Sequence, residues 1–262
     1  MIALPRIMVA PNGARLTKTD HPAIPLNLDE IIACARDCHA AGADGIHAHI
    51  RAADGQHLLD GARYRELVSA LRSEVPDLAV QVTTEAVGRY APAAQMEVAL
   101  NAGADMVSVS IREICRADMS DVRRFFHQCR DGGIAVQHIL YDRGDCDLLA
   151  EVLSADDLHN PALQLLYVLG RYSENMQSTP RDLSPFIDWQ TSLNIAPDWA
   201  VCAFGKNEAV CLKAAVALGG KCRVGFENSL YLSDGSTAAD NAEKVKDLRE
   251  FLKRDHEAPP QR

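Results

Sequence analysis

Two histidines, His47 and His49, stand one residue apart in the apolar run GIHAHIR at residues 45–51. A short apolar run of this kind predicts a buried strand, in which alternate side chains point to the same face. Burying two imidazoles is unfavourable unless each finds a partner. Two neutral imidazoles and a carboxylate form a standard Zn²⁺ ligand set that leaves positions open for substrate oxygens. The pair therefore predicts a metal site.

Glu227 is the expected third ligand. It follows the last predicted strand in RVGFENSLY, and in a closed barrel that strand lies beside the first one. The sequence also allows Glu85 or Asp142, which follow other predicted strands. The structural alternative is that one histidine hydrogen-bonds a backbone group in the core while the other faces a helix.

The elements that must position these residues alternate along the chain. Short β-rich runs predict strands, and the longer amphipathic segments between them predict helices. The strands are expected at residues 6–10, 45–50, 78–84, 105–110, 134–140, 163–169, 198–204 and 222–226, and the helices at 28–41, 60–75, 91–102, 120–132, 145–154, 180–193, 207–219 and 237–254. Eight such pairs in about 250 residues are typical of an α/β protein of the (β/α)₈ TIM-barrel class. No G-x-G-x-x-G follows the first strand to favour an open doubly wound sheet.

No linker or charge block divides the chain, so we expect a single domain over residues 1–262 with a frayed tail at 255–262. Active sites of such barrels lie at the carboxyl ends of the strands. Besides the metal candidates, the polar residues expected at these ends are Thr83, Thr84, Glu85, Ser110, Arg112, Glu113, His138, Tyr141, Asp142 and Asn228.

A second candidate site binds phosphate. The loop FGKNEA carries Gly205 and Lys206 and opens a helix, and GGKCRVG carries Lys221 and ends at Gly225. In many barrels the loops after strands seven and eight bind phosphate through backbone N–H groups and a helix N-terminus. The alternative is an ordinary turn with a solvated lysine.

Composition excludes several classes of protein. A formal net charge of −9 argues against binding to nucleic acid or to an anionic membrane surface. The eight cysteines contain no C-x-x-C pair, which predicts free thiols in a reducing cytoplasm. The opening MIALPRIMVAPNGAR is expected to be neither a signal peptide nor a membrane span.

Five segments together resemble the β-keto acid cleavage enzymes, over about residues 7–250. They are APNGARLTKTDHPAIPLNLDEI, AGADGIHAHIRAADG, VQVTTEAVG, GGKCRVGFENSLY and SDGSTAADNAEKV, and their most specific parts are H-x-H-x-R-x-x-D-G and R-x-G-x-E. The resemblance implies a (β/α)₈ barrel, a homo-oligomer (tetramer or dimer), and Zn²⁺ held at His47, His49 and Glu227. It also implies an acyltransferase that converts a β-keto acid and acetyl-CoA into acetoacetate and a new acyl-CoA. The metal would bind the keto and carboxylate oxygens and acidify the methylene between them.

Some catalytic residues of the family are present in this sequence and others are replaced. The arginine that orients the base corresponds to Arg223, and a usual serine corresponds to Thr83. The catalytic aspartate corresponds to Asn228, whose amide has no useful basicity. If the base has moved, Glu85 and Glu113 are the candidates, and Arg15 stands where some members carry an acid.

Two other functions remain open. One is a zinc-dependent lyase, aldolase or hydrolase that acts on a small oxo-acid without CoA. The other is a catalytically silent barrel that binds metal but turns nothing over. Only the acyltransferase consumes acetyl-CoA in the presence of β-keto acids, so this measurement separates it from both alternatives.

Overall fold

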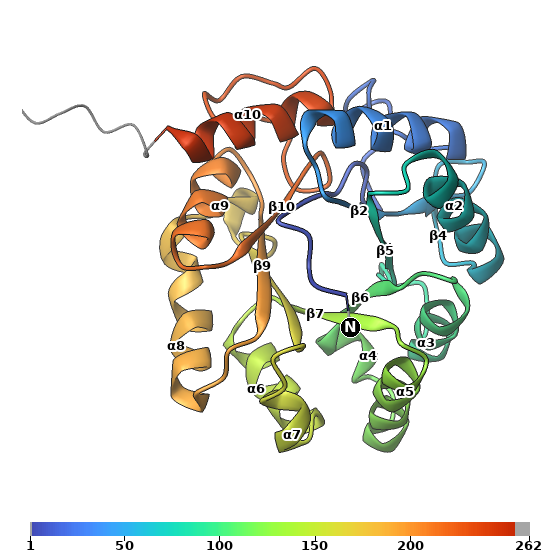
Figure 1. Ribbon diagram of the computed structural model, residues 1–262, viewed down its shortest axis with the longest axis vertical. Helices are drawn as coiled ribbons and strands as arrows, with labels where there is room; N and C mark the ends of the chain where they lie inside the picture. Colours follow the sequence, from blue (N-terminus) through green and yellow to red (C-terminus); the bar gives the residue numbers. More distant parts are fainter. Residues whose placement is uncertain (1, 255–262) are drawn as a thin grey trace, which may run out of the picture.

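The structure is a computed structural model that describes residues 2–254, so the predicted tail at 255–262 lies outside the described residues. Parallel strands close into a barrel in the order β1-β10-β9-β8-β7-β6-β5-β2, with helices around it (Figure 1). The barrel strands are β1 (Ile7–Val9), β2 (Gly45–Ala48), β5 (Ala79–Thr83), β6 (Met106–Ser110), β7 (Ala135–Leu140), β8 (Gln164–Leu169), β9 (Asp198–Ala203) and β10 (Lys221–Val224). This confirms the predicted (β/α)₈ barrel.

The α-helices are α1 (Leu28–Ala41), α2 (Gly61–Glu74), α3 (Pro92–Asn101), α4 (Ile111–Ile114), α5 (Met119–Asp131), α6 (Arg143–Val152), α7 (Ala155–Leu158), α8 (Ser184–Leu193), α9 (Glu208–Ala217) and α10 (Asn241–Lys253). Their ends follow local chemistry. The α1 helix begins at a capping box in which Asn27 accepts from the Glu30 backbone N–H, and it ends at Gly42 with φ 105°. Within the described residues, no helix combines the length and the apolar character needed to cross a membrane.

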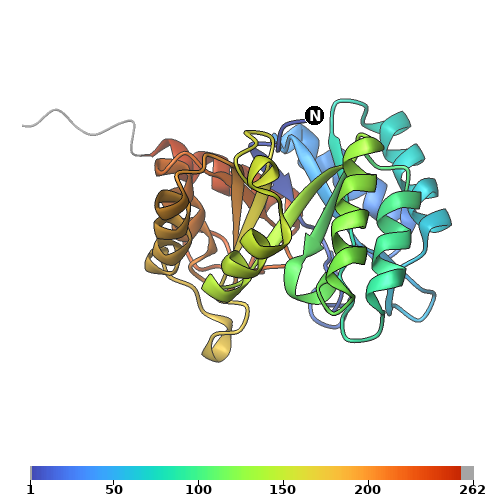
Figure 2. The same ribbon diagram turned by 90° about the horizontal axis from the view of Figure 1, so that it is seen from below.

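Two predicted elements differ in detail, and the structure adds short elements that were not predicted. The strand expected at 45–50 ends at Ala48, and a hairpin of β3 (Ile50–Arg51) and β4 (His57–Leu58) follows it. The helix expected at 180–193 is a 3₁₀ turn, η2 (Pro180–Leu183), followed by α8. Another 3₁₀ turn, η1 (Glu174–Met176), lies in the gold-coloured loop after β8, which projects beyond the body of the molecule in Figure 2.

Strand β1 brings the two ends of the predicted metal site together. It pairs with β10 on one side and with β2 on the other, so that Val9 is level with Val224 and with Ile46. The residues that follow these positions, His47 on β2 and Glu227 beyond β10, are therefore close in space although they are far apart in sequence. Apolar side chains such as Met106 and Leu166 fill the barrel interior below them.

Candidate metal and substrate site

A cavity of about 370 Å³ lies at the carboxyl ends of the strands. Its lining includes the predicted site residues His47, Thr83, Glu85, Gly205, Arg223, Glu227 and Asn228. Gly13, Arg15, Ser110, Tyr141 and Arg171 also line it. The polar ends of several strands thus meet in one cavity, as the barrel geometry requires.

His47, His49 and Glu227 converge at one edge of this cavity. The two Nε2 atoms are 3.0 Å apart, and Glu227 Oε2 lies 3.7 Å from His47 Nε2 and 3.4 Å from His49 Nε2. One possible ligand atom from each residue falls within 4.8 Å of the others. Both histidines are buried. The alternative third ligands are not part of this cluster: Glu85 pairs with Arg15 and Asp142 pairs with Arg112.

A chain of hydrogen bonds fixes the tautomer of His47. Gln137 donates to the Leu165 carbonyl, so its Oε1 is left to accept from Gln81 Nε2 at 2.9 Å. The Oε1 of Gln81 then accepts from His47 Nδ1 at 2.8 Å. The proton of His47 therefore sits on Nδ1, and the lone pair of Nε2 faces His49 and Glu227.

The electrostatics of these residues suit a cation. Burial, reinforced by Arg223, holds the pKa of His47 well below its usual value, so the ring is neutral. Burial opposes ionisation of Glu227, but Arg223 and the two imidazoles hold its pKa well below the usual range. The Oε2 atom of Glu227 is buried and has no hydrogen-bond partner among the described residues. A single proton can bridge only one pair of these atoms, whereas a metal ion satisfies all of them, so the residues fit a metal.

The position of Glu227 depends on the loop after β1. Gly13 has φ +56°, and a Cβ at this residue would lie 2.5 Å from Glu227 Cγ. Arg51, the arginine of the H-x-H-x-R motif, donates to the carbonyls of Asn12, Gly13 and Leu16 and so holds this loop in place. On its other side, Glu227 Oε1 accepts from Arg223 Nη2 at 3.1 Å.

His57 is a buried residue near the site that the sequence analysis did not single out. Its ring centroid lies 5.2 Å from that of His49, and its Nε2 donates to the carbonyl of Glu85 at 2.7 Å. Burial lowers its pKa to about 3. It therefore packs as a neutral ring between the candidate metal ligand and the loop after β5. A third histidine within a dozen residues of GIHAHIR was the available signal.

The two candidate bases occupy different environments. Glu85 lines the cavity, where its Oε1 pairs with Arg15 Nη1 at 2.9 Å, and its backbone N–H donates to the Thr83 hydroxyl. Glu113 is not among the lining residues. Its Oε2 accepts from the Ala86 backbone N–H at 2.9 Å and from Gln95 at 3.0 Å, so it secures the loop after β5.

The predicted phosphate site has no free backbone donor at Gly225, because its N–H donates to the buried carboxylate of Glu208 at 3.3 Å. Lys244 Nζ pairs with the other oxygen of Glu208 at 2.6 Å. Lys206 is exposed and lies over the ring of Tyr231. Lys221 pairs with Asp198 at the start of its strand, which is the opposite end of the barrel. Of the residues predicted to bind phosphate, all of which the structure describes, Gly205 alone lines the cavity.

Asn228 belongs to the buried hydrogen-bonded group that contains Glu208, Lys244 and the Gly225 backbone. Its Nδ2 donates to the Arg223 carbonyl at 3.0 Å and lies 3.5 Å from Glu208 Oε1, while its Oδ1 accepts from Arg223 Nη2 at 3.4 Å. The amide supplies donors where a carboxylate has none. Asn228 thus positions Arg223 rather than acting as a base.

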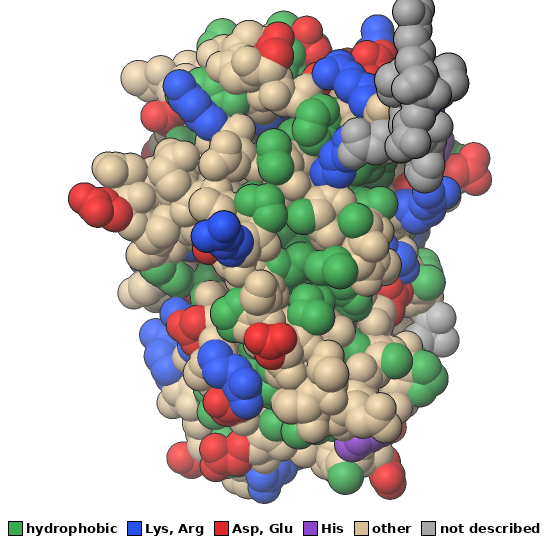
Figure 3. Space-filling model, turned by 90° about the vertical axis from the view of Figure 1, so that its left-hand side faces the viewer, with side chains coloured by type: hydrophobic (Ala, Val, Ile, Leu, Met, Phe, Trp, Pro, Cys, Tyr) green, Lys and Arg blue, Asp and Glu red, His purple; other side chains and the backbone are tan. Residues whose placement is uncertain are grey.

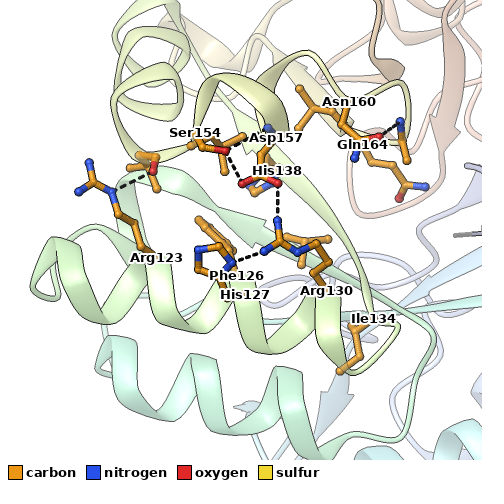
Figure 4. A pocket seen from close by; sticks show the side chains of 15 residues that line it. Arg123, Phe126, His127, Arg130, Ile134, His138, Ser154, Asp157, Asn160 and Gln164 are labelled. Carbon is orange, nitrogen blue, oxygen red and sulfur yellow. Dashed lines mark hydrogen bonds and ion pairs between the residues drawn. The ribbon is translucent and has the colours of Figure 1, made fainter.

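His138 does not join the cavity at the barrel mouth. It faces outward from β7, edge-on to Phe126 of α5, and lines a second cavity of about 310 Å³ on the outside of the barrel (Figure 4). On the same wall, Arg130 pairs with Asp157, which also accepts from Ser154. The expectation that His138 lies at the mouth is therefore wrong, because adjacent strand residues point to opposite faces.

Comparison with known proteins gives the family. A sequence model described as beta-keto acid cleavage enzyme matches residues 6–260. The chain is 28% identical over 247 residues to the 3-keto-5-aminohexanoate cleavage enzyme of Fusobacterium nucleatum, covering 89% of this chain and 86% of that protein. It is 23% identical to the 3-oxoadipate:acetyl-CoA acetyltransferase of Cupriavidus necator, covering 92% of this chain and 86% of that protein.

Solved structures support the fold. A ternary complex of ObcA with a C4-CoA adduct and oxalate matches with a TM-score of 0.66 at 14% identity, covering 90% of this chain. The matched part is 65% of the ObcA chain, so this chain spans just under two thirds of that structure. A type I 3-dehydroquinate dehydratase from Clostridium difficile matches with a TM-score of 0.63 at 12% identity, covering 97% of this chain and 94% of that one. The family match over nearly the whole sequence confirms the resemblance seen in its motifs, and the chain belongs to the β-keto acid cleavage enzyme family.

Proposed function

We propose that the chain is a zinc-dependent acyltransferase that cleaves a β-keto acid with acetyl-CoA, giving acetoacetate and a new acyl-CoA. The observation that carries this proposal is the convergence of His47, His49 and Glu227 beside an open cavity. Membership of the family and the names of two relatives, a β-keto acid cleavage enzyme and an acetyl-CoA acetyltransferase, support the reaction class.

His47, His49 and Glu227 would hold the Zn²⁺, which when bound supplies a Lewis acid for the keto and carboxylate oxygens of the substrate. Gln81 orients His47 toward that position through the hydrogen bond to Nδ1. Arg223 orients Glu227 from the other side. The protein thus fixes both kinds of ligand before substrate enters.

Glu85 is the proposed base that removes the proton from the activated methylene. Among the described residues that line the cavity, it is the only carboxylate besides Glu227. Its ion pair with Arg15 holds the carboxylate in place at the cavity. The Thr83 hydroxyl accepts from the backbone of Glu85, so its own hydrogen is available to a substrate oxygen.

Tyr141 is a candidate donor for the oxygen of the thioester. It lines the cavity, and burial raises its pKa well above the usual value, so the phenol stays protonated at neutral pH. A protonated phenol can donate to an oxygen on which negative charge develops as the carbanion attacks the thioester.

The test is to incubate the purified protein with acetyl-CoA and a panel of β-keto acids, and to measure acetoacetate and new acyl-CoA by mass spectrometry. The metal content of the same preparation is measured by elemental analysis. We expect both products and about one zinc per chain. A fully active preparation without metal contradicts the zinc assignment. Loss of the keto acid without consumption of thioester identifies the lyase, aldolase or hydrolase instead.

The replacement of the family aspartate by Asn228 favours one alternative, a barrel that binds metal and keto acid without turnover. It predicts zinc in the preparation, a measurable affinity for β-keto acids by calorimetry, and no product with any of them. The panel above separates this function from the proposed one.

We also propose that the protein is a homo-oligomer. Apolar side chains gather on the face formed by α8 and α9 (Figure 3). Val210 and Val216 of α9 and Leu218, which follows it, are 44%, 42% and 57% exposed, and large exposed apolar side chains favour a protein partner. Sedimentation velocity is expected to give a dimer or tetramer that Leu218→Glu dissociates. A wild-type monomer at micromolar concentration contradicts this assignment.

A further inference from the structure

The cavity at the barrel mouth contains three arginines, and their partners differ. Arg15 pairs with Glu85 at 2.9 Å, and Arg223 pairs with Glu227 at 3.1 Å. Arg171, which lines the same cavity, has no carboxylate within ion-pair distance among residues 2–254. The described part of the chain therefore leaves one positive charge of the cavity without a counter-charge.

The surroundings of Arg171 hold its guanidinium without supplying an anion. The group lies 5.1 Å from the centroid of the Phe204 ring and 5.9 Å from that of Tyr172. Its Nη1 donates to Met176 Sδ at 3.3 Å, and a thioether is a weak acceptor. Aromatic faces and a sulfur atom orient the half-buried guanidinium without neutralising its charge, so the group is left to bind an anion that enters the cavity.

The position of Arg171 is opposite the candidate metal ligands. In the closed ring, β8 is four strands away from β2 in either direction, so the two strands face each other across the mouth. Arg171 comes two residues after the end of β8, while His47 is on β2. A molecule whose keto acid group binds beside His47 and extends across the cavity therefore ends near Arg171.

The remaining charges in the cavity favour an anion at that end. Among the described lining residues, the only carboxylates are Glu85 and Glu227, and each already pairs with an arginine. A cationic substrate tail would compete for these carboxylates, whereas an anionic tail meets an unpaired cation. The phosphates of CoA, at the far end of the long pantetheine arm, are expected to lie outside a cavity of about 370 Å³.

We propose that Arg171 is a specificity-determining residue that binds a carboxylate at the far end of the β-keto acid, so that the substrate is a 3-oxo dicarboxylate. This inference rests on the proposed function for its reaction. The planar guanidinium binds a carboxylate through two parallel N–H···O bonds, which selects for charge and for orientation together.

The test compares 3-oxoadipate with 3-oxohexanoate, which has the same number of carbons and an uncharged tail, by measuring kcat/KM at saturating acetyl-CoA. The wild-type protein is expected to prefer 3-oxoadipate by roughly 10- to 100-fold, the range of a hydrogen bond to a charged group. Arg171→Met keeps the length and apolar contacts of the side chain and should abolish that preference while changing the value for 3-oxohexanoate less than about threefold. Arg171→Lys should keep part of the preference.

Arg89→Met is the matched control, because Arg89 is exposed and does not line the cavity. Equal losses for both keto acids in Arg171→Met overturn the proposal, as does an increased KM for acetyl-CoA without a change in tail preference, which would assign Arg171 to the CoA phosphates. Thermal unfolding of each variant shows whether the fold is retained.

Direct binding separates failure of this inference from failure of the proposed function. Calorimetry without acetyl-CoA measures the affinities of 3-oxoadipate and 3-oxohexanoate for the wild-type protein and for Arg171→Met. Tighter binding of 3-oxoadipate that depends on Arg171 supports the anion site even if no thioester is consumed. Equal affinities for the two keto acids, or equal kcat/KM values for them, overturn the anion site. The proposed reaction is not affected by that result.

Discussion

The two cavities of this protein are similar in volume and differ in what their polar groups do. The mouth cavity has about 370 Å³ and the outer-wall cavity about 310 Å³, and each is lined by a buried histidine and by arginines. On the outer wall, Arg130, Asp157 and Ser154 satisfy one another. At the mouth, Glu227 Oε2 is left without a hydrogen bond beside two histidine nitrogens.

The comparison shows that a buried histidine does not define a functional site by itself. His138 also has an unpartnered nitrogen, but within residues 2–254 no carboxylate converges on it with a second histidine to make a ligand set. His47 and His49 meet Glu227 because β1 joins β2 and β10. Convergence of several unsatisfied atoms distinguishes the mouth cavity, and the following variants test that difference.

Removal of a metal ligand should have the largest effect. We expect His47→Ala and His49→Ala to lose the zinc, and acyl transfer to fall by at least about 10³-fold, since even one lost oxyanion donor typically lowers kcat by about 10²- to 10³-fold. Elemental analysis and steady-state kinetics measure both. His138→Phe, in the outer wall, should keep metal and activity. Equal losses in His138→Phe would mean that the two cavities do not differ as described.

Replacement of the base should come next. Glu85→Gln keeps the shape of the side chain and should lower kcat by about 10²- to 10⁴-fold, the contribution of a positioned general base. The metal content should not change. Glu113→Gln is the matched comparison, because Glu113 holds the backbone N–H of Ala86 outside the cavity. Glu113→Gln should lower the unfolding temperature and leave kcat nearly unchanged. If Glu113→Gln instead lowers kcat more than Glu85→Gln does, the base is Glu113.

A smaller effect is expected from the residue behind the metal ligand. Gln81→Leu removes the acceptor that holds the proton of His47 on Nδ1, and should weaken zinc affinity by about 10- to 100-fold. Competition with a chelator measures this affinity. Gln137→Leu removes the acceptor that orients the Gln81 amide but leaves Gln81 itself in place, so it should weaken zinc affinity less than Gln81→Leu does. An unchanged zinc affinity in Gln81→Leu would contradict the role of the tautomer.

The outer wall should affect stability and not catalysis. Burial lowers the pKa of His138 from 6.5 to about 4, so between these values the unfolded chain binds the proton and the folded chain does not. Stability should therefore fall as pH decreases from 6.5 to 4, by about 3 kcal/mol from this residue. His138→Phe should reduce the loss, measured by urea unfolding at pH 7 and at pH 4.5. An unchanged pH dependence would contradict the neutral buried state of His138.

The sequence predicted the barrel because its strands and helices differ clearly in length and pattern. The short hairpin β3–β4 was missed because two-residue strands carry no periodic signal, although it places His57 beside His49. The direction of His138 could not be predicted for a related reason. A strand of a parallel barrel is buried on both faces, so its residues give no alternation that separates inside from outside.

Only part of the candidate site could be predicted from the sequence, and the reasons are physical. His47, His49 and Glu227 could be singled out because each is unusual where it stands. The roles of Glu113 and Gly225 could not, since a residue near a strand end either lines the cavity or secures a loop depending on hydrogen bonds that only the folded chain shows. Gln81 and Gln137 also offered a signal, namely an amide within each of two largely apolar strands.

The buried group around Asn228 also limits which side chains position 228 can hold. An aspartate at 228 would lose the donor to the Arg223 carbonyl and would stand 3.5 Å from a carboxylate oxygen of Glu208. Glu208 in turn is held by Lys244 and by the Gly225 backbone. Asn228→Asp alone therefore places two carboxylates side by side, while Asn228→Asp together with Glu208→Gln does not. The side chain that position 228 accepts is therefore coupled to the charge at position 208.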